Sequence, residues 1–318
     1  MKYLPELAHR SAPSIGGSGP PDRNQRLSIV IFLLPAAVLF FTFVLFPIIQ
    51  AAYFSLFRWN GLGPLENYVA LDNFKEMLQH APFQKALQHN GIIIVLSLTV
   101  QLPLALALAL LVRRNLPGRI VFRTIFFTPY IIAEAIVAVL WSFIFNPRFE
   151  ASHFINSVLD TLLPFFDPGP WLGDPDKVLI AVFVVLTWKY FGLHMILYIA
   201  GLQGISREIE ESASVDGATG WQTLWYITIP MLRRTIVTTV YLSVLGSIQQ
   251  FDLVWLMTQG GPVNSSEVLA TYMYRYGFVS FRLGYGAAVA IYLFIICLTF
   301  SLVYQRLFMR GDSLGGAT

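Results

Sequence analysis

The chain has 318 residues, of which 56% are hydrophobic and only 12% are charged, and its formal net charge is +3 at pH 7. Soluble globular proteins average about 25% charged residues, so the composition predicts that lipid covers part of this surface. The single cysteine, Cys297, excludes a disulfide framework and a cysteine-based metal cluster. The scattered basic residues argue against nucleic acid as a partner.

The first 26 residues are polar and contain the stretch SAPSIGGSGPPD. Gly, Ser and Pro at this density are typical of disorder, so we predict a disordered tail over residues 1–26. The apolar run that follows, Leu27–Phe57, is too long and too bulky for a cleaved signal peptide. It is predicted to be the first membrane helix, bent near Pro35 or Pro47.

Six apolar runs are long enough to cross a membrane, which takes about 20 residues of helix. They cover residues 28–56, 91–112, 124–145, 178–203, 235–257 and 286–305. We therefore predict an all-α membrane protein with six transmembrane helices. Its membrane domain extends over residues 27–310, and a second short tail covers 311–318.

Lys and Arg are distributed unequally between the two sides of these spans. Thirteen of the 21 fall on the side that holds both termini, seven fall on the opposite side, and Lys189 lies within a span. The excess of positive charge marks the cytoplasmic side. We therefore predict that both termini, both tails and residues 206–230 lie in the cytoplasm.

Two segments on the opposite side have patterns of their own. Residues 66–90 place apolar residues at helical spacing among polar ones, which predicts an amphipathic helix on the membrane surface. Residues 146–177 are rich in Asp and Pro. Two interpretations of this second segment are open: a stiff loop that faces an extracytoplasmic partner, and a solvated connector.

Residues 206–230 form a polar, acidic segment between two long apolar runs. It carries Glu208, Glu210 and Glu211, then a turn signal at Asp216-Gly217. A Thr219…Gln222 pair has the spacing of a capping box. This pattern predicts a helix, a tight glycine turn and a second short helix on the membrane surface. A soluble partner would explain why a loop carries such structure.

The spacing within this segment is specific. Glu211, Ala213, Gly217, Ile227 and Pro230 match the pattern of the EAA loop, so the chain resembles the permease subunits of binding-protein-dependent ABC importers. Ser212 and Ile229 replace the Ala and Leu of that pattern.

The resemblance extends beyond this loop and covers roughly residues 28–310. Asp216-Gly217-Ala218 followed by Trp221 resembles the carbohydrate-uptake branch of the family, as does Ala200-Gly201-Leu202-Gln203. Thr258–Pro262, with Ser265, Ser266 and Glu267 after it, resembles the outer loop of one of the two permease types in these importers. Gly284–Ala288 resembles the G-Y-x-x-A entry to the last span.

The resemblance implies that residues 206–230, between helices 4 and 5, are a coupling loop seated in a cytoplasmic ATPase subunit. The ATPase-coupling residues would be Glu208, Glu211, Ala213, Asp216, Gly217 and Pro230. Glu211 would pair with a basic group of the ATPase, and Gly217 would make the turn, because only glycine takes positive φ without a side-chain penalty. The alternative is an interfacial helix without a partner.

The same resemblance implies a set of partners and a location. The partners are a second related permease that forms a heterodimer with this chain, two ATPase subunits, an extracytoplasmic solute-binding protein, a sugar or sugar derivative, and membrane lipid. The location is the inner membrane of a prokaryote. The chain has no G-x-x-x-x-G-K-[ST] phosphate loop, so we expect no catalytic residue, cofactor or metal in it. ATP and magnesium would belong to the ATPase.

Polar side chains within spans indicate where a substrate binds, because they tend to face a cavity. Ser243, Ser247 and Gln250 share one helix face, and in the preceding span Lys189 and Tyr190 lie at a comparable depth. These five are the predicted substrate-binding residues. Close helix packing is an alternative role for the serines, and a structural hydrogen bond is the simpler role for the neighbouring His194.

Lys189 needs a partner within its span. Glu134 and Asp252 are acids within spans that could pair with it, and an anionic group of the substrate is the alternative. Asp252–Trp255 could also form part of an outer gate. The residue types do not identify the sugar.

Two other classes of protein fit the sequence less well. A membrane-embedded transferase would need clustered acids or histidines, but the only D-x-D is Asp174-Pro175-Asp176 in a Pro-rich outer loop. A stand-alone transporter would leave residues 206–230 without a role.

Overall fold

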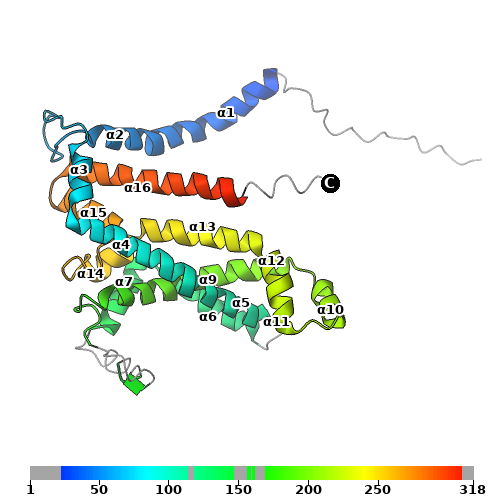
Figure 1. The fold of residues 1–318 in the computed structure, drawn as a ribbon. Coiled ribbons are helices and arrows are strands. Elements are labelled where there is room, and N and C mark those ends of the chain that lie inside the picture. Colours follow the sequence, from blue (N-terminus) through cyan, green and yellow to red (C-terminus); the bar gives the residue numbers. More distant parts are fainter. Residues whose placement is uncertain (1–22, 114–117, 147–155, 159, 162–168, 310–318) are drawn as a thin grey trace, which may run out of the picture. The chain divides into compact units, whose positions relative to one another are not determined.

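The computed structural model describes residues 23–113, 118–146, 156–158, 160–161 and 169–309. Within these ranges the regular structure is helical, apart from one isolated antiparallel bridge between Phe57 and Tyr68, and Figure 1 shows the helices in chain order. The chain divides into two compact units after Gln50. The predicted second tail, 311–318, and most of the first lie outside the described residues.

The first unit contains one apolar helical run. It comprises α1 (Arg23–Phe40), the π-helical segment η1 (Phe41–Leu45) and the start of α2 (Phe46–Phe54). Residues 23–26, which were predicted to belong to the tail, are the first turn of α1, because a polar turn can extend an apolar helix. The π-helical segment precedes Pro47, whose missing N–H leaves a carbonyl one turn earlier without its usual donor.

The second unit holds all the remaining helices. They are α3 (Asp72–Gln79), α4 (Ala81–Leu96), η2 (Ser97–Gln101), α5 (Leu102–Arg113), α6 (Arg119–Ile131), α7 (Glu134–Ile144), α9 (Val178–Gln203), α10 (Arg207–Val215), α11 (Gly220–Thr223), η3 (Leu224–Thr228), α12 (Ile229–Met231), α13 (Arg233–Gln249), α14 (Asp252–Thr258), α15 (Leu269–Tyr274), η4 (Arg275–Val279), α16 (Leu283–Tyr304) and η5 (Gln305–Met309).

Four helical runs are long and apolar enough to cross a membrane: Leu27–Phe54, Ala81–Arg113, Val178–Gln203 and Leu283–Met309. Two further pairs reach that length only together. The pair α6 and α7 is bent by 98°, and the pair α13 and α14 by 42°. The described residues therefore contain four candidate spans, or six if each bent pair counts as one.

The amphipathic segment 66–90 differs from its prediction as a single surface helix. Only α3 lies apart. His80 is extended, and a new helix starts at Ala81 with Pro82 in its first turn, where the fixed φ of proline suits a helix start. The second membrane-length run therefore begins ten residues earlier than predicted. Most of the other outer segment, 146–177, lies outside the described residues.

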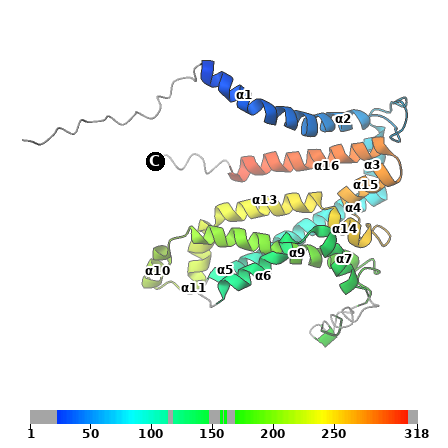
Figure 2. The same cartoon turned by 180° about the vertical axis from the view of Figure 1, so that it is seen from behind.

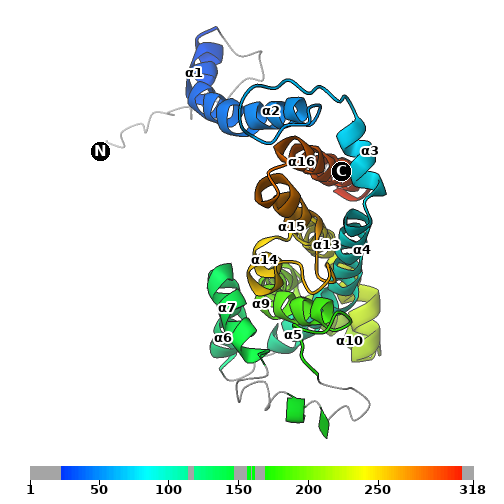
Figure 3. The ribbon, with the colours of Figure 1, turned by 90° about the vertical axis from the view of Figure 1, so that its left-hand side faces the viewer.

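The helix α9 is the most enclosed of the candidate spans, and it packs against α5, α6 and α13 (Figure 2). Two glycines allow this close approach. A Cβ at Gly192 would collide with the carbonyl of Phe126 on α6, and one at Gly201 would collide with Thr235 on α13. On the other side of the unit, α16 packs against α15 and α3 (Figure 3).

Lys189 bonds to the backbone at the break between α6 and α7. Its side chain is 3% exposed, and its ammonium donates to the carbonyl oxygens of Ile132 at 2.6 Å and Tyr130 at 3.4 Å. These carbonyls stand where α6 ends, and a helix end carries partial negative charge. The bend therefore supplies the partner that Lys189 needs.

Two asparagines form hydrogen bonds with backbone groups at other helix ends in the same way. Asn90 is buried on α4 and donates to the carbonyl oxygen of Ser247 near the end of α13, at 2.7 Å, while its own oxygen accepts from the N–H of Leu269 at 2.8 Å. Asn73 on α3 donates to the carbonyls of Ser55 and Phe57, just beyond α2. In this way single side chains hold distant segments together.

The loop between α14 and α15 is closed by polar contacts. Ser266 bonds to Thr258 and donates to the carbonyl oxygen of Gly261 at 2.6 Å, and the fully buried Glu267 pairs with Arg275 at 3.0 Å. Burial raises the pKa of the Glu267 carboxyl, although a hydrogen bond from Thr271 and the nearby Arg275 oppose the shift. The stretch 258–267 is therefore a fixed structure.

Replacing Asn90 with Leu should destabilise the second unit. The change leaves the Ser247 carbonyl and the Leu269 N–H without this partner, at about 1–3 kcal/mol for each buried group left unpaired. Thermal unfolding of the detergent-solubilised protein measures the loss. Gln88→Leu is the matched control, because Gln88 is exposed on the same helix; equal losses in the two variants would contradict the role given to Asn90.

Candidate functional site

Residues 206–230 have the predicted order of helix, turn and second helix. The first helix is α10, and α11, η3 and α12 continue the second through to Met231. Ser206 caps α10 by accepting from the N–H of Glu208. We call residues 206–230 the α10–α12 segment. It projects at one end of the second unit (Figure 1).

The turn between the helices depends on Gly217. Its φ is +85°, a region that glycine enters without a steric penalty. The N–H of Ala218 donates to the carbonyl of Ala213 at 2.9 Å, and the N–H of Gly217 donates to that of Ser214 at 3.1 Å. These two bonds define a Schellman motif. The last carbonyls of α10 are thereby satisfied, and Ala213 lies buried beneath them.

The second helix begins with the predicted capping box. The hydroxyl of Thr219 accepts from the N–H of Gln222, and the side chain of Gln222 accepts from the N–H of Thr219 at 2.8 Å. At the far end, Pro230 lies in the first turn of α12. Local sequence therefore determines where the helices on either side of the Gly217 turn begin and end.

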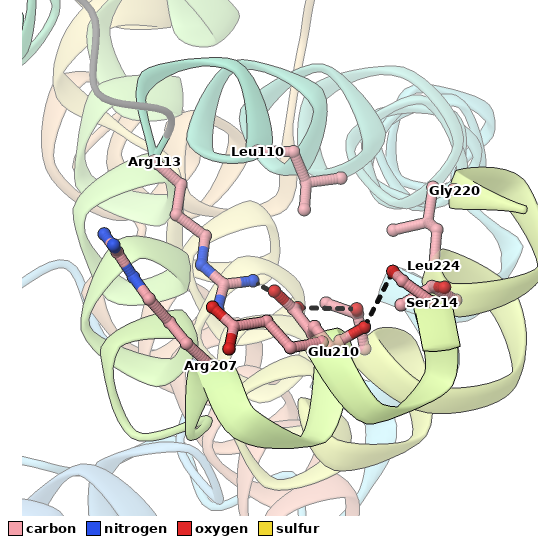
Figure 4. Close-up of a pocket in the computed structure, with 10 residues that line it drawn as sticks. Leu110, Arg113, Arg207, Glu210, Ser214, Gly220 and Leu224 are labelled. Carbon is pink, nitrogen blue, oxygen red and sulfur yellow. Dashed lines mark hydrogen bonds and ion pairs between the residues drawn. The ribbon is translucent and has the colours of Figure 1, made fainter. Parts of the chain in front are cut away.

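Glu210 ties the α10–α12 segment to the membrane helices. Its carboxylate accepts from Arg113 at the end of α5, at 2.6 Å, and from the hydroxyl of Thr228 at 3.1 Å. Figure 4 shows Arg113, Glu210 and Arg207 beside a groove of about 700 Å³. Glu211 also lines this groove. One carboxylate therefore joins α5, α10 and the second helix.

The predicted coupling acids are more exposed than Glu210. Glu208 and Glu211 are exposed, as is Asp216, whereas Glu210 and Ala213 point inward, one helical turn apart. Sequence reasoning had assigned a role to Glu208 and Glu211 but not to Glu210. The signal that could have found it is the three-residue spacing between Glu210 and the buried Ala213.

The segment exposes several large apolar side chains. Val215, Tyr226 and Trp221 are 87%, 79% and 68% exposed, and the rings of Trp221 and Trp225 meet edge to face with centroids 5.6 Å apart. Large aromatic side chains displayed on a capped, rigid turn are typical of a protein contact surface.

A second candidate site is a cavity of about 210 Å³ between α4–η2, α9 and α13. Four of the five predicted substrate residues line it: Tyr190, Ser243, Ser247 and Gln250. The Oγ of Ser243, the Nε2 of Gln250 and the Nδ1 of His194 are buried there without a hydrogen-bond partner among the described residues. Unpaired buried polar atoms are unfavourable, so a hydrogen-bonding ligand or water would stabilise this cavity.

Sequence reasoning missed two residues of this cavity, Ser97 and Gln101 on η2. Their spacing of four residues is the same signal that singled out Ser243 and Ser247. The hydroxyl of Ser97 lies 3.4 Å from that of Ser247, so the two helices meet through polar groups.

Lys189 does not line the cavity, because its ammonium points to the break after α6. The next residue, Tyr190, donates a short hydrogen bond to Glu134 in the first turn of α7. Asp252 lies in the first turn of α14, and Leu253 and Val254 after it are buried. A gating role for Asp252–Trp255 stays a prediction.

The sequence is similar to known transport proteins. Residues 101–310 match the family described as "Binding-protein-dependent transport system inner membrane component". A probable ABC transporter permease protein of Pyrococcus horikoshii is 33% identical and covers 89% of this chain and 96% of its own. The diacetylchitobiose uptake system permease protein NgcF of Streptomyces coelicolor is 30% identical, over 92% and 87%.

A solved structure has the same fold. It is the bacterial alginate ABC transporter in complex with an alginate pentasaccharide-bound periplasmic protein, and one chain of it superimposes with a TM-score of 0.76 at 25% identity. The alignment covers 90% of this chain and 96% of that one.

Glu210→Gln should loosen the α10–α12 segment from α5. The change removes a charge-assisted hydrogen bond that is largely shielded from water, worth about 1–2 kcal/mol. Amide hydrogen exchange in α10 should therefore accelerate by about 5- to 30-fold. Glu208→Gln, on the exposed face of the same helix, serves as the control. Equal exchange rates in the two variants would refute the anchoring role of Glu210.

Proposed function

The chain belongs to the family of binding-protein-dependent transport system inner membrane components, and from this premise we propose how it couples transport to ATP. It is a multi-pass permease subunit of the carbohydrate-uptake kind, a transport protein and not an enzyme. We propose that the α10–α12 segment docks into a cytoplasmic ATPase subunit and that the cavity beside α9 forms half of the path for a sugar.

The observation that carries the coupling proposal is the exposed apolar face of a structurally fixed segment. Val215, Trp221 and Tyr226 stand in the open, while caps and the Gly217 turn hold the backbone beneath them. Little ordering entropy would be lost when a partner covers such a surface. Glu208 and Glu211 flank it and would meet basic groups of the ATPase.

The combined change Val215→Ala and Trp221→Ala should weaken binding of the ATPase subunit. Central aromatic contacts contribute about 2 kcal/mol or more to an interface, so the affinity should fall at least about 30-fold. Co-purification of the ATPase and ATP-dependent uptake in proteoliposomes both measure the effect.

The control pair removes exposed apolar area elsewhere. Leu298→Ala and Leu302→Ala lie on the exposed face of α16 and should leave ATPase binding unchanged. Undiminished ATPase binding by the Val215 and Trp221 variant would rule out docking through this face. Absence of ATPase binding by the unaltered protein would instead favour the stand-alone transporter.

The substrate proposal follows from the cavity lining. Hydroxyl and amide groups of Ser243, Ser247 and Gln250 lie beside the ring of Tyr190, a combination that suits the hydroxyls and C–H faces of a sugar. Lys189 is engaged by backbone carbonyls, which favours a neutral sugar over an anionic one. Ligand pockets usually measure about 300–1,000 Å³, so this smaller cavity would need a second permease to complete it.

Gly246→Leu should block uptake without unfolding the protein. Gly246 lines the cavity, and a Cβ there would meet no atom within 4 Å, so the side chain would fill space that the sugar needs. Sugar uptake into proteoliposomes should fall to background. Gly91→Leu is the matched control, because Gly91 is exposed on α4 and a Cβ there would also meet no atom within 4 Å. Normal uptake by the Gly246 variant would place the path elsewhere.

The assembly proposed around this chain has further members. A second related permease would face the cavity, two ATPase subunits would bind ATP and magnesium, and an extracytoplasmic solute-binding protein would deliver the sugar. Both termini and the α10–α12 segment would lie in the cytoplasm, in accord with the excess of Lys and Arg on that side.

A further inference from the structure

A pocket of about 420 Å³ lies where α5 ends, α6 begins and α9 runs into α10. Four of the residues that line it are arginines: Arg113, Arg119, Arg123 and Arg207. No acidic residue is among its described lining. It adjoins the groove of the α10–α12 segment, because Arg113 and Arg207 line both.

The pocket gathers positive charge and contains an unpaired donor. Glu210 reaches Arg113 from the groove side through a single guanidinium nitrogen, and four guanidinium groups line the pocket. The Nε of Arg123 is buried and has no hydrogen-bond partner among the described residues. An anion with several acceptor oxygens would pair with this Nε and would be attracted by the positive charge around it.

Phosphate has the chemistry that fits. Guanidinium groups bind phosphate oxygens through paired hydrogen bonds, and a phosphate has enough acceptors for several arginines at once. Gln203 and Ser206 at the same pocket supply uncharged hydrogen-bonding groups. A carboxylate would satisfy fewer of these donors.

The surroundings indicate a lipid as the source of the phosphate. Three of the arginines, Arg113, Arg119 and Arg123, lie in the last turn of α5 or the first turns of α6. Next to Arg119 and Arg123 on α6, the apolar residues Ile120, Val121 and Ile125 are exposed, as acyl chains would require. Basic pockets between membrane helices are known to hold anionic headgroups. We propose that this pocket binds the headgroup phosphate of an anionic phospholipid.

The position of the pocket gives the lipid a consequence for coupling. The bound phosphate would hold Arg113 and Arg207 at the base of the α10–α12 segment, and Arg113 is the residue that Glu210 grips. Anionic lipid would therefore stiffen the attachment of this segment to α5. This consequence rests on the proposed function, whereas the binding itself does not.

The test uses the full-length chain purified with the subunits that accompany it. Vesicles of phosphatidylglycerol or of phosphatidylcholine are added to the detergent-solubilised protein, and retained lipid is measured by native mass spectrometry. Phosphatidylglycerol should be retained preferentially. Arg119→Gln with Arg123→Gln should weaken its binding about fivefold for each arginine replaced. Arg233→Gln, an exposed arginine at the same end of the unit but outside the pocket, should retain the lipid fully.

Three results would overturn the proposal: equal retention of the two lipids by the unaltered protein, equal retention of phosphatidylglycerol by the double variant and the control, or complete displacement of the lipid by millimolar inorganic phosphate. The last result would assign the pocket to a soluble anion. The unaltered protein alone decides the first and third, so a double variant that fails to fold does not block the test. Lipid retention needs no ATP, so it can fail while the coupling variants behave as expected, and the reverse also holds.

Discussion

The constraint on which this structure depends is the need to pair every backbone carbonyl and N–H away from water. Each bend in a membrane helix breaks that pairing, and here a side chain from a distant segment restores it. Lys189 donates hydrogen bonds to carbonyls at the end of α6. Asn90 bonds to the backbone at the end of α13 and at the start of α15, and Asn73 donates to carbonyls just after α2. Lys189 and Asn90 therefore have a structural role within the spans. The sharp bend between α6 and α7 persists because an ammonium group on α9 satisfies its free carbonyls.

This constraint separates two kinds of polar residue that look alike in sequence. Lys189 and Tyr190 are neighbours in sequence. The ammonium of Lys189 is hydrogen-bonded to backbone carbonyls, whereas Tyr190 lines the cavity. Asn90 has both its amide nitrogen and its amide oxygen engaged between segments, whereas Ser243 and Gln250 keep buried atoms without a partner among the described residues. Unpaired atoms mark where a ligand can contribute, and paired ones mark where the fold holds itself together. By this criterion the cavity between η2, α9 and α13 is the candidate substrate site, and Lys189 belongs to the scaffold.

Sequence reasoning succeeded where the physics is local. The Gly217 turn, the Thr219–Gln222 capping box and the shared face of Ser243 and Ser247 each follow from a few adjacent residues. The Glu210–Arg113 pair, by contrast, joins residues 97 positions apart. The local spacing can point to Glu210 but does not identify Arg113 as its partner. The partner of Lys189 could not be predicted from the sequence either, because it is a pair of backbone carbonyls that become free only through the bend. The helix 66–90 was predicted as one piece because its apolar spacing runs on past the interruption at His80 and Pro82.

The same contacts describe a mechanical path from the α10–α12 segment to the cavity. Glu210 forms an ion pair with Arg113, the last residue of α5, and α5 is continuous with η2 and α4 in the run Ala81–Arg113. Ser97 and Gln101, which line the cavity, stand on η2, the π-helical part of this run, and such irregular turns often mark functional sites in helices. In the proposed function, a displacement of the segment by an ATPase subunit would pull on α5 through one carboxylate. The irregular turn beside the cavity would take up that displacement, so the polar groups that face the sugar would move when the ATPase moves.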